Sequence, residues 1–346
     1  MDGLDAVLVE AEGTGLDVRV RSVRYVSAEL GELAHGLRAA AGNEPVTAHE
    51  LTRLALELGE LLALTFGRLV DESGTTPSVC VLPGQTLVHA PPVSLQLINP
   101  WPVAHRLGCP VLHDIRGADI AAGGQGAPIT PLADWVLFRS DTERRAIVNL
   151  GGFCNVTTIA RDSDPDGIAG FDVCACTTVL DACARAALGE AYDRNGNSAC
   201  EGTPDEDATT QLLDILRAQS SGGRSLGTGD ECTAWVDRHT SLQAPTLLAS
   251  ATRAIGTAIG ERVRDSDAVI LAGGGTQNAA LVRSIEDVVG ACATTAAFGI
   301  GVQEREAVCI AVIGLLALDG ITYTRQHITR RPRAISCEGS WIGVRP

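Results

Sequence analysis

The chain has 346 residues, 45% of them hydrophobic, and a formal net charge of −15. This length is sufficient for two domains with separate cores. The negative charge argues against nucleic acid or an anionic membrane surface as a partner. All 27 basic residues are Arg, and a chain without Lys cannot use P-loop, Schiff-base or pyridoxal phosphate chemistry.

The thiols and the apolar runs indicate a cytoplasmic protein. The eleven Cys include no CxxC pair and no zinc-type spacing, so we expect reduced and mostly buried thiols. The most apolar run, 307–318, is too short to span a bilayer. No basic stretch followed by an apolar one opens the sequence, so we expect no signal peptide and no membrane partner.

The first part of the chain predicts a strand pair, two helices and then short alternating elements. The predicted segments are strands 4–10 and 18–26, helices 29–41 and 48–70, strand 79–82, helix 103–107 and strand 110–113. Thr47, with Glu50 three residues later, forms a capping box that starts the long helix. The polar stretch 83–86 predicts a turn.

The second part alternates strands and helices through glycine-rich turns. The predicted segments are strands 146–150, 156–160 and 168–171, helix 244–263, strand 268–271, and helices 279–289 and 304–318. Thr177 or Thr178 can cap a helix after the third strand. We expect loops over 190–241, with one helix at 209–219, and an Arg-rich tail from Tyr323 on the surface. This alternation favours an α/β architecture with a cleft between two halves.

Candidate site residues are dense where the strand at 110–113 ends. That strand delivers three charged side chains, Asp114, Arg116 and Asp119, which suit a polar substrate better than a core. A small-residue loop follows, containing Gly123, Gly124, Gln125 and Gly126. Such a loop offers backbone N–H groups to an anion such as phosphate. Tight turns with surface ion pairs are the alternative.

Two later glycine turns are also candidate phosphate sites. Gly151 and Gly152 join two predicted strands, with Asn149 and Asn155 on either side. Gly273, Gly274 and Gly275 join a strand to a helix whose N-terminus favours negative charge, and Asn278 follows them. A structural hairpin and a tight strand-to-helix connection remain the alternatives.

Two carboxylates stand among apolar or small residues. Asp172 ends a predicted apolar strand, where burial can raise the pKa of a carboxyl group and suit it to general-base work. An Asp favoured by a helix N-terminus is the alternative. Glu306 lies in a helix of small apolar residues, where contact with a polar ligand would explain it. His89 and His113 are lesser candidates, because a solitary His is usually structural.

Several motifs, in order and over nearly the whole chain, resemble the anhydro-N-acetylmuramic acid kinase family of the actin-like ATPase and sugar kinase superfamily. The similar segments are GQTLVH (84–89), HDIRGADIAAGGQGAPITP (113–131), AIVNLGGFCN (146–155), GFD (170–172), LDA (180–182), YDRNG (192–196), AGGGTQN (272–278) and the helix around Glu306. The GGQGAP segment with its DIR and Asp119 neighbours is distinctive, whereas the GGG turn alone is a weak signal.

The resemblance implies an α/β protein with the two-domain actin-like ATPase, ribonuclease H-like fold and an interdomain cleft. The expected domains are 1–117, to which a tail of about 335–346 returns, and 118–334, which binds the nucleotide. The implied activity converts 1,6-anhydro-N-acetylmuramic acid to N-acetylmuramic acid 6-phosphate with ATP and Mg²⁺. Water opens the anhydro ring in this cell-wall sugar recycling reaction. A homodimer is expected because relatives form one.

The resemblance also assigns roles to matching positions. Asp172 would activate the water, and Arg116, Asp119, Gln125 and Glu306 would hold the sugar. The phosphate and nucleotide contacts would come from Asp2, Gly3, Asn149, Gly151, Gly152, Asn155, Gly273, Gly274, Gly275 and Asn278. No residue is assigned to a metal.

The chain departs from the family pattern at three places. The family has a strand and a Gly-Thr-Ser turn before its Asp-Gly pair, whereas this sequence opens at Met1-Asp2-Gly3. In-frame codons for that turn upstream of Met1 would support the kinase, and a stop codon there would weaken it. Residues 173–177, Val-Cys-Ala-Cys-Thr, replace Thr-Gly-Pro-Gly-Asn, and Pro83 replaces a His. These changes favour an alternative, a relative that binds a sugar or nucleotide without the reaction, whereas the retained site residues favour the kinase.

Overall fold

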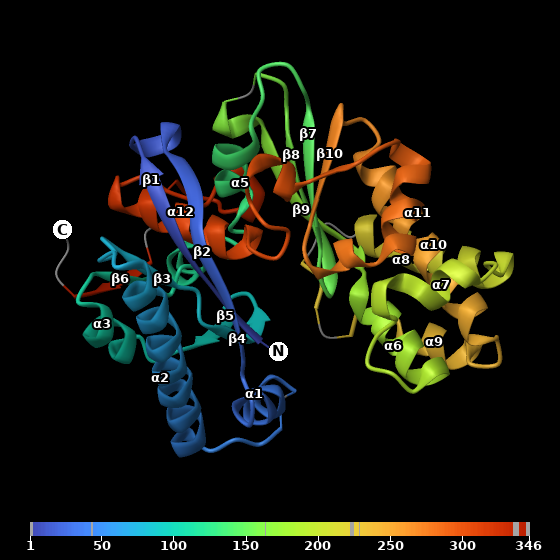
Figure 1. Cartoon of the computed structure of the whole chain (residues 1–346), viewed down its shortest axis with the longest axis horizontal. Coiled ribbons are helices and arrows are strands. Elements are labelled where there is room, and N and C mark those ends of the chain that lie inside the picture. Colours follow the sequence, from blue (N-terminus) through green and yellow to red (C-terminus); the bar gives the residue numbers. More distant parts are fainter. Residues whose placement is uncertain are drawn as a thin grey trace. The chain divides into compact units, whose positions relative to one another are not determined.

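The computed structural model describes residues 3–42, 44–162, 164–221, 225–227, 229–334 and 339–343. The chain forms two compact units, which Figure 1 shows. The first unit contains Met1–Leu137 and Glu306–Pro346, and the second is the continuous stretch Phe138–Arg305. The expected domains, 1–117 and 118–334, differ from this division, because residues 118–137 and 306–334 belong to the first unit.

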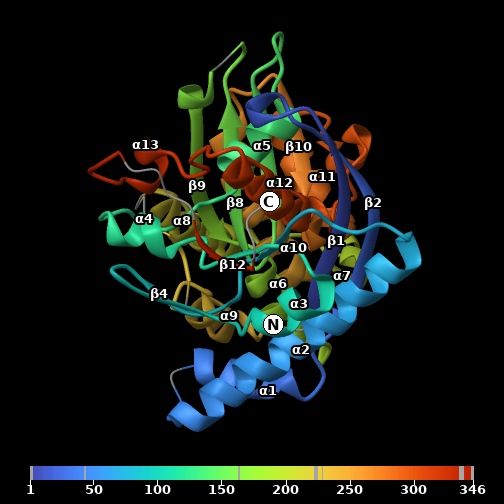
Figure 2. The ribbon, with the colours of Figure 1, turned by 90° about the vertical axis from the view of Figure 1, so that its left-hand side faces the viewer.

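The first unit opens with a strand pair that packs on a long helix. β1 (Gly3–Glu12) and β2 (Arg19–Glu29) are antiparallel, as predicted. α1 (Leu33–Ala41) and α2 (Ala48–Ser73) follow, and they lie side by side in Figure 2. α1 begins later than predicted because β2 runs on to Glu29. The predicted capping box is confirmed, since Thr47 and Glu50 each accept from the other's N–H.

Two small sheets and several short helices complete the first unit. β3 (Cys80–Leu82) and β6 (Val111–His113) are parallel, and β12 (Ser340–Ile342) pairs antiparallel with β6. β4 (Gln85–Ala90) and β5 (Val93–Leu97) form a hairpin that begins inside the turn predicted at 83–86. The helices are α3 (Trp101–Leu107), α4 (Gly117–Ala121), α5 (Pro131–Phe138), α12 (Arg305–Leu318) and α13 (Gln326–Thr329). The hairpin buries Leu87 and Leu97 in the core around α1 and α2. The polar residues at its start therefore do not predict it, because burial of these two leucines stabilises the strands.

The second unit is built on a mixed five-stranded sheet in the order β11-β10-β7-β8-β9. The strands are β7 (Arg145–Leu150), β8 (Phe153–Ile159), β9 (Ile168–Ala175), β10 (Ala268–Ala272) and β11 (Ala293–Thr294). The first three form an antiparallel meander, and β10 and β11 run parallel to β7. This order and these directions are those of a ribonuclease H-like fold, so the α/β fold class is confirmed.

Helices cover one face of this sheet (Figure 1). They are α6 (Thr177–Leu188), α7 (Asn197–Glu201), α8 (Glu206–Ser221), α9 (Thr233–His239), α10 (Ala244–Val263) and α11 (Ala279–Val289). On β7, Val148 and Leu150 are fully buried in the core that these helices share. Because side chains alternate along a strand, Ile147 and Asn149 lie on the opposite face.

The helix predicted at 209–219 is confirmed as α8, whereas the rest of 190–241, expected to be loops, also contains α7 and α9. α8 and α9 bury Leu212, Leu216 and Trp235 in the core of the second unit. The Arg-rich tail buries Tyr323 and Arg331, so its expected surface position is wrong. The described residues contain no helix with both the length and the apolarity needed to cross a membrane.

Candidate active site

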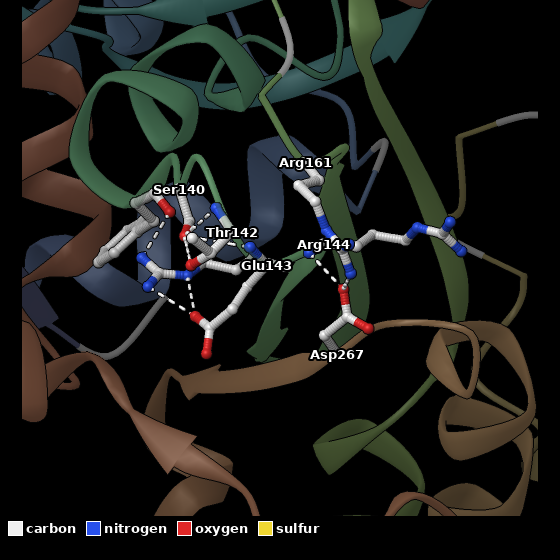
Figure 3. Close-up of polar contacts among 8 residues, drawn as sticks. Ser140, Thr142, Glu143, Arg144, Arg161 and Asp267 are labelled. Carbon is white, nitrogen blue, oxygen red and sulfur yellow. Dashed lines mark hydrogen bonds and ion pairs between the residues drawn. The ribbon is translucent and has the colours of Figure 1, made fainter.

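Polar groups next to the amino ends of β7 and β10 form hydrogen bonds with one another. Asp267, just before β10, accepts hydrogen bonds from the Arg144 N–H at 2.7 Å and the Arg161 guanidinium at 3.0 Å (Figure 3). Ser140 Oγ accepts from the N–H groups of Thr142 and Glu143 before β7 (Figure 3). In open α/β sheets ligands bind at the carboxyl ends of strands, where this chain has its glycine turns.

A row of polar side chains crosses three strands on the sheet face opposite the helices. Asn149 on β7 pairs with Asn155 on β8, and Asn155 pairs with Asp172 on β9. Directly paired residues on antiparallel strands place their side chains on the same face. Neighbouring members of the row are therefore about 4.8 Å apart, the spacing of adjacent strands. The row combines two amides with one carboxylate.

Asp172 lies inside β9 and not at its end, because the strand continues to Ala175. The expected strand end is therefore wrong. Val173, Cys174 and Cys176 are fully buried in the second unit's core, which draws the chain onward as strand. The Leu226 N–H donates to Asp172 Oδ2 at 2.8 Å, so the half-buried carboxylate has a fixed orientation.

The turn at Gly151 and Gly152 is bonded to the start of α6. The Cys176 N–H donates to the Gly152 carbonyl at 2.8 Å, and the Thr177 N–H donates to the Gly151 carbonyl at 3.0 Å. Thr178 Oγ1 also donates to the Gly152 carbonyl, at 2.8 Å. Cys176 occupies the N-cap of α6, so neither threonine caps the helix as predicted. The carbonyl groups of Gly151 and Gly152 therefore fix the hairpin turn to the start of α6.

The turn at 273–275 packs against the end of β7. A Cβ atom at Gly273 would lie 2.7 Å from Asn149 Oδ1, and one at Gly275 would lie 2.7 Å from Leu150 Cβ. Both positions therefore require glycine for close packing. A Cβ atom at Gly274 would meet no described atom within 4 Å. Asn278 caps α11, since its Oδ1 accepts from the Leu281 N–H at 3.0 Å.

In the first unit, Asp119 holds the loop of residues 123–126, here termed the 123–126 loop, from inside. Asp119 is 1% exposed, and its Oδ2 accepts from the Gly126 N–H at 2.8 Å. Its carbonyl accepts from the Gly124 N–H at 2.9 Å, and Thr329 O accepts from the Gln125 N–H at 2.8 Å. Since these three N–H groups have protein acceptors, the expectation that they bind an anion is wrong.

The rest of the charged group surrounds this loop. Arg116 Nη1 donates to the Gly126 carbonyl at 2.6 Å, and the Gln125 side chain is exposed. Asp114 adopts a φ of 49° and accepts from the Gly117 N–H at 3.2 Å, at the start of α4. Asp119 and Arg116 therefore bind the 123–126 loop, whereas Asp114 binds the start of α4.

The comparisons with known proteins agree on one family. The family model described as anhydro-N-acetylmuramic acid kinase matches residues 1–337. A protein of that name from Salinibacter ruber is 32% identical, covering 95% of this chain and 90% of its own. One from Pseudomonas putida is 30% identical, covering 95% of this chain and 93% of its own.

The chain belongs to the anhydro-N-acetylmuramic acid kinase family. This membership supports a kinase that uses ATP, and not the alternative of a non-catalytic relative. Two solved structures align more loosely. The activator of the 2-hydroxyisocaproyl-CoA dehydratase from Clostridium difficile is 11% identical, with a TM-score of 0.42, covering 90% of this chain and 94% of that chain. The ROK hexokinase from Thermus thermophilus is 15% identical, with a TM-score of 0.31, and the alignment covers 89% of this chain and 98% of the hexokinase chain.

The site residues predicted for an anhydro-N-acetylmuramic acid kinase form two groups, one in each unit. The second unit holds the predicted catalytic and nucleotide residues Asn149, Gly151, Gly152, Asn155, Asp172, Gly273, Gly274, Gly275 and Asn278. The first unit brings together Arg116, Asp119 and Gln125. Gly3 opens β1, and Asp2 lies outside the described residues.

Glu306 differs from its predicted setting. It lies in the first turn of α12 and is exposed, and it is not enclosed by the small apolar residues of that helix. A carboxylate in the first turn is favoured by the helix dipole, which accounts for its presence there. Its contact with the sugar stays a prediction.

His89 in the GQTLVH motif is a stronger candidate for a ligand contact than the sequence analysis indicated. Its Nδ1 lies 2.9 Å from Ser94 Oγ, whereas its buried Nε2 has no hydrogen-bond partner among the described residues. Partial burial, and then the charge of Arg116, lowers the pKa of His89, so the ring is neutral near pH 7. The signal that identifies it is its place in the family motif.

Proposed function

We propose that the protein phosphorylates 1,6-anhydro-N-acetylmuramic acid on O6 with ATP, while water opens the anhydro bridge. The product is N-acetylmuramic acid 6-phosphate. The observation that carries the proposal is the match to one kinase family over residues 1–337. It is supported by the aligned row of Asn149, Asn155 and Asp172 beside two glycine turns.

The nucleotide would bind at the carboxyl ends of β7 and β10. Ala272 pairs with Asn149 there, so the two glycine turns leave the sheet side by side. Gly274 has open space where a side chain would be, which lets a phosphate approach its backbone. Asn149 and Asn155 supply neutral donors near the phosphates. Phosphoryl transfer depends mainly on such positioning and on charge stabilisation.

Mg²⁺, when bound, neutralises charge on the phosphates. The described residues contain no group of three or more His, Cys, Asp or Glu that could hold a metal ion. Mg²⁺ prefers phosphate oxygens and water, with one or two protein carboxylates. The row, with the oxygens of Asn155 and Asp172, fits that preference. We therefore propose Mg²⁺ held chiefly by the nucleotide.

Asp172 would act as the general base toward water. Its Oδ2 is held by the Leu226 N–H, which keeps the carboxylate in one orientation without protonating it. Proton removal by a positioned base is worth roughly a hundred- to ten-thousand-fold in rate. The water's oxygen then bonds to the anomeric carbon as the bond from that carbon to O6 breaks. O6 takes the γ-phosphoryl group as the bond between that group and ADP breaks.

The sugar would be held by side chains of the first unit. Arg116, with its guanidinium fixed on the Gly126 carbonyl, and the exposed Gln125 and Glu306 are proposed as direct contacts. Asp119 is buried and bonded to its own loop, so we assign it a positioning role. We place the reaction in the cytoplasm, in keeping with ATP as donor and free thiols at every described Cys. Homodimerisation stays a prediction.

The decisive experiment measures product from the anhydro sugar, ATP and Mg²⁺ in water labelled with heavy oxygen. Mass spectrometry should find the 6-phosphate with one labelled oxygen, because water opens the ring. Asp172→Asn should bind both substrates yet lose at least about a hundredfold in turnover. Asp166→Asn, at an exposed carboxylate before β9, is the matched control and should keep full activity.

Two results would contradict the proposal. Undiminished product from Asp172→Asn would remove Asp172 from its role. A wild-type protein that binds the sugar or ATP but makes no phosphosugar would support a binding protein instead.

A further inference from the structure

The tail expected on the surface is buried in the first unit. Tyr323 is 2% exposed, Thr324 3%, Thr329 0% and Arg331 4%. Tyr323 OH donates to the Ile115 carbonyl at 3.1 Å, next to the segment that carries Arg116. This tail is therefore part of the structure around the proposed sugar site.

One buried ion pair joins the tail to Asp119. Arg331 Nη1 donates to Asp119 Oδ1 at 2.7 Å and to Thr324 Oγ1 at 2.8 Å, and its Nε donates to the Arg333 carbonyl at 2.8 Å. Thr329 Oγ1 donates to the same Asp119 oxygen at 2.8 Å. A buried ion pair of this kind is satisfied only with its full set of hydrogen bonds, so its geometry is well defined.

The tail also contacts the 123–126 loop directly. Thr329 O accepts from the Gln125 N–H at 2.8 Å. A Cβ atom at Gly123 would lie 3.0 Å from Pro332 Cγ, so the ring of Pro332 packs closely against the loop. Asp119 Oδ2 holds the Gly126 N–H, and the Gly126 carbonyl holds Arg116. A continuous path of hydrogen bonds thus runs from Arg331 through Asp119 and the loop to Arg116.

We propose that Arg331, assisted by Thr329, is a positioning residue for the sugar site. It fixes the 123–126 loop so that the guanidinium of Arg116 and the side chain of Gln125 are held toward the sugar. The inference rests on the proposed function, because it takes this loop as part of the sugar site. Arg331 itself is buried and acts through Asp119.

Kinetics of the full chain test this role. Arg331→Met should raise the KM for the anhydro sugar at least about tenfold, since small misplacements of binding groups are costly. The KM for ATP should stay unchanged. Arg331→Lys, which keeps a donor for Asp119, should restore part of the sugar affinity. Arg333→Met changes an exposed Arg of the same tail and should match the wild type.

A milder variant guards against misfolding. Thr329→Val removes one donor to Asp119 but keeps the main-chain contact with Gln125, and should raise the sugar KM about threefold. An unchanged sugar KM in folded Arg331→Met, or equal rises for sugar and ATP, would overturn the inference.

Hydrogen exchange tests the positioning without any turnover. Arg331→Met and Thr329→Val should speed exchange of the amides at 124–126, while those at 273–275 keep the wild-type rate. Unchanged exchange at 124–126 would defeat this inference alone. A wild-type protein that makes no phosphosugar, with the exchange result as expected, would defeat the proposed function alone.

Discussion

The 123–126 loop of the first unit and the 273–275 turn of the second differ in what the missing side chains make room for. At Gly124 a Cβ atom would lie 2.1 Å from the Asp119 carboxylate, so glycine admits the protein's own charge. At Gly273 and Gly275 the end of β7 occupies the space that a Cβ atom would need. At Gly274, the middle residue of that turn, the same space holds none of the described atoms. The first loop thus displays side chains, and the second displays backbone.

The largest effect should come from the second turn. Gly273 has a φ of 85° and a ψ of 170°, a region nearly restricted to glycine, and Gly273→Ala also overlaps Asn149 and Leu150. We expect a loss of about 3 kcal/mol or more in the free energy of unfolding, measured by urea titration. Gly274→Ala is the control and should cost less than about 1 kcal/mol. Equal losses would mean that the packing of this turn does not need glycine at 273.

A smaller loss of stability is expected from the 123–126 loop, where a substitution should affect the KM for the sugar and not the KM for ATP. Gly124→Ala pushes on Asp119 and should cost about 2 kcal/mol in stability. It should raise the KM for the sugar and leave that for ATP unchanged, whereas Gly274→Ala should do the reverse. Gly189→Ala, at an open αL position after α6, should strain the backbone without changing either KM. The same selectivity in Gly124→Ala and Gly274→Ala would contradict the comparison.

A third effect concerns pH and is tested on thiols of the second unit. Burial raises the pKa of Cys176 and Cys183 to about 12, and that of Cys232 to about 11, all in the second unit. A raised folded-state pKa means that stability is present below the unfolded pKa near 9 and is lost as pH rises toward the folded value. The free energy of unfolding should therefore fall above about pH 9, by up to about 1.4 kcal/mol per pH unit for each such thiol.

Urea titrations from pH 7 to about pH 11 measure this slope. Cys183→Ala should lower stability at neutral pH but flatten the alkaline decline. Cys200→Ser, at an exposed thiol, should leave the slope unchanged. A slope that is insensitive to Cys183 would exclude this thiol as its source.

Local signals were sufficient for much of the fold. The bounds predicted for α10 and α11 match the structure, because their apolar positions recur at helical spacing between clear turns. The hairpin also follows from the sequence, but its register does not: a two-residue turn at Gly151 and Gly152 would pair Leu150 with Phe153, whereas the structure pairs Leu150 with Cys154 and Asn149 with Asn155. Asp172 joins that row through strand pairing that no local pattern encodes.

What sequence reasoning missed depends on contacts between distant residues. Asp119 and Arg331 are far apart in the chain, and the sequence predicted a substrate contact for the first and a surface position for the second. Only their mutual burial turns a polar loop and an Arg-rich tail into one structure. The β4–β5 hairpin is similar, because its polar first residues conceal the burial of Leu87 and Leu97.

The second unit is one uninterrupted segment, and the chain enters and leaves it at helix ends, Phe138 of α5 and Arg305 of α12. A gene fragment spanning those codons therefore encodes the whole ribonuclease H-like sheet with its covering helices. Recombination between relatives can exchange that cassette in a single event, whereas the other unit is encoded in two separate pieces.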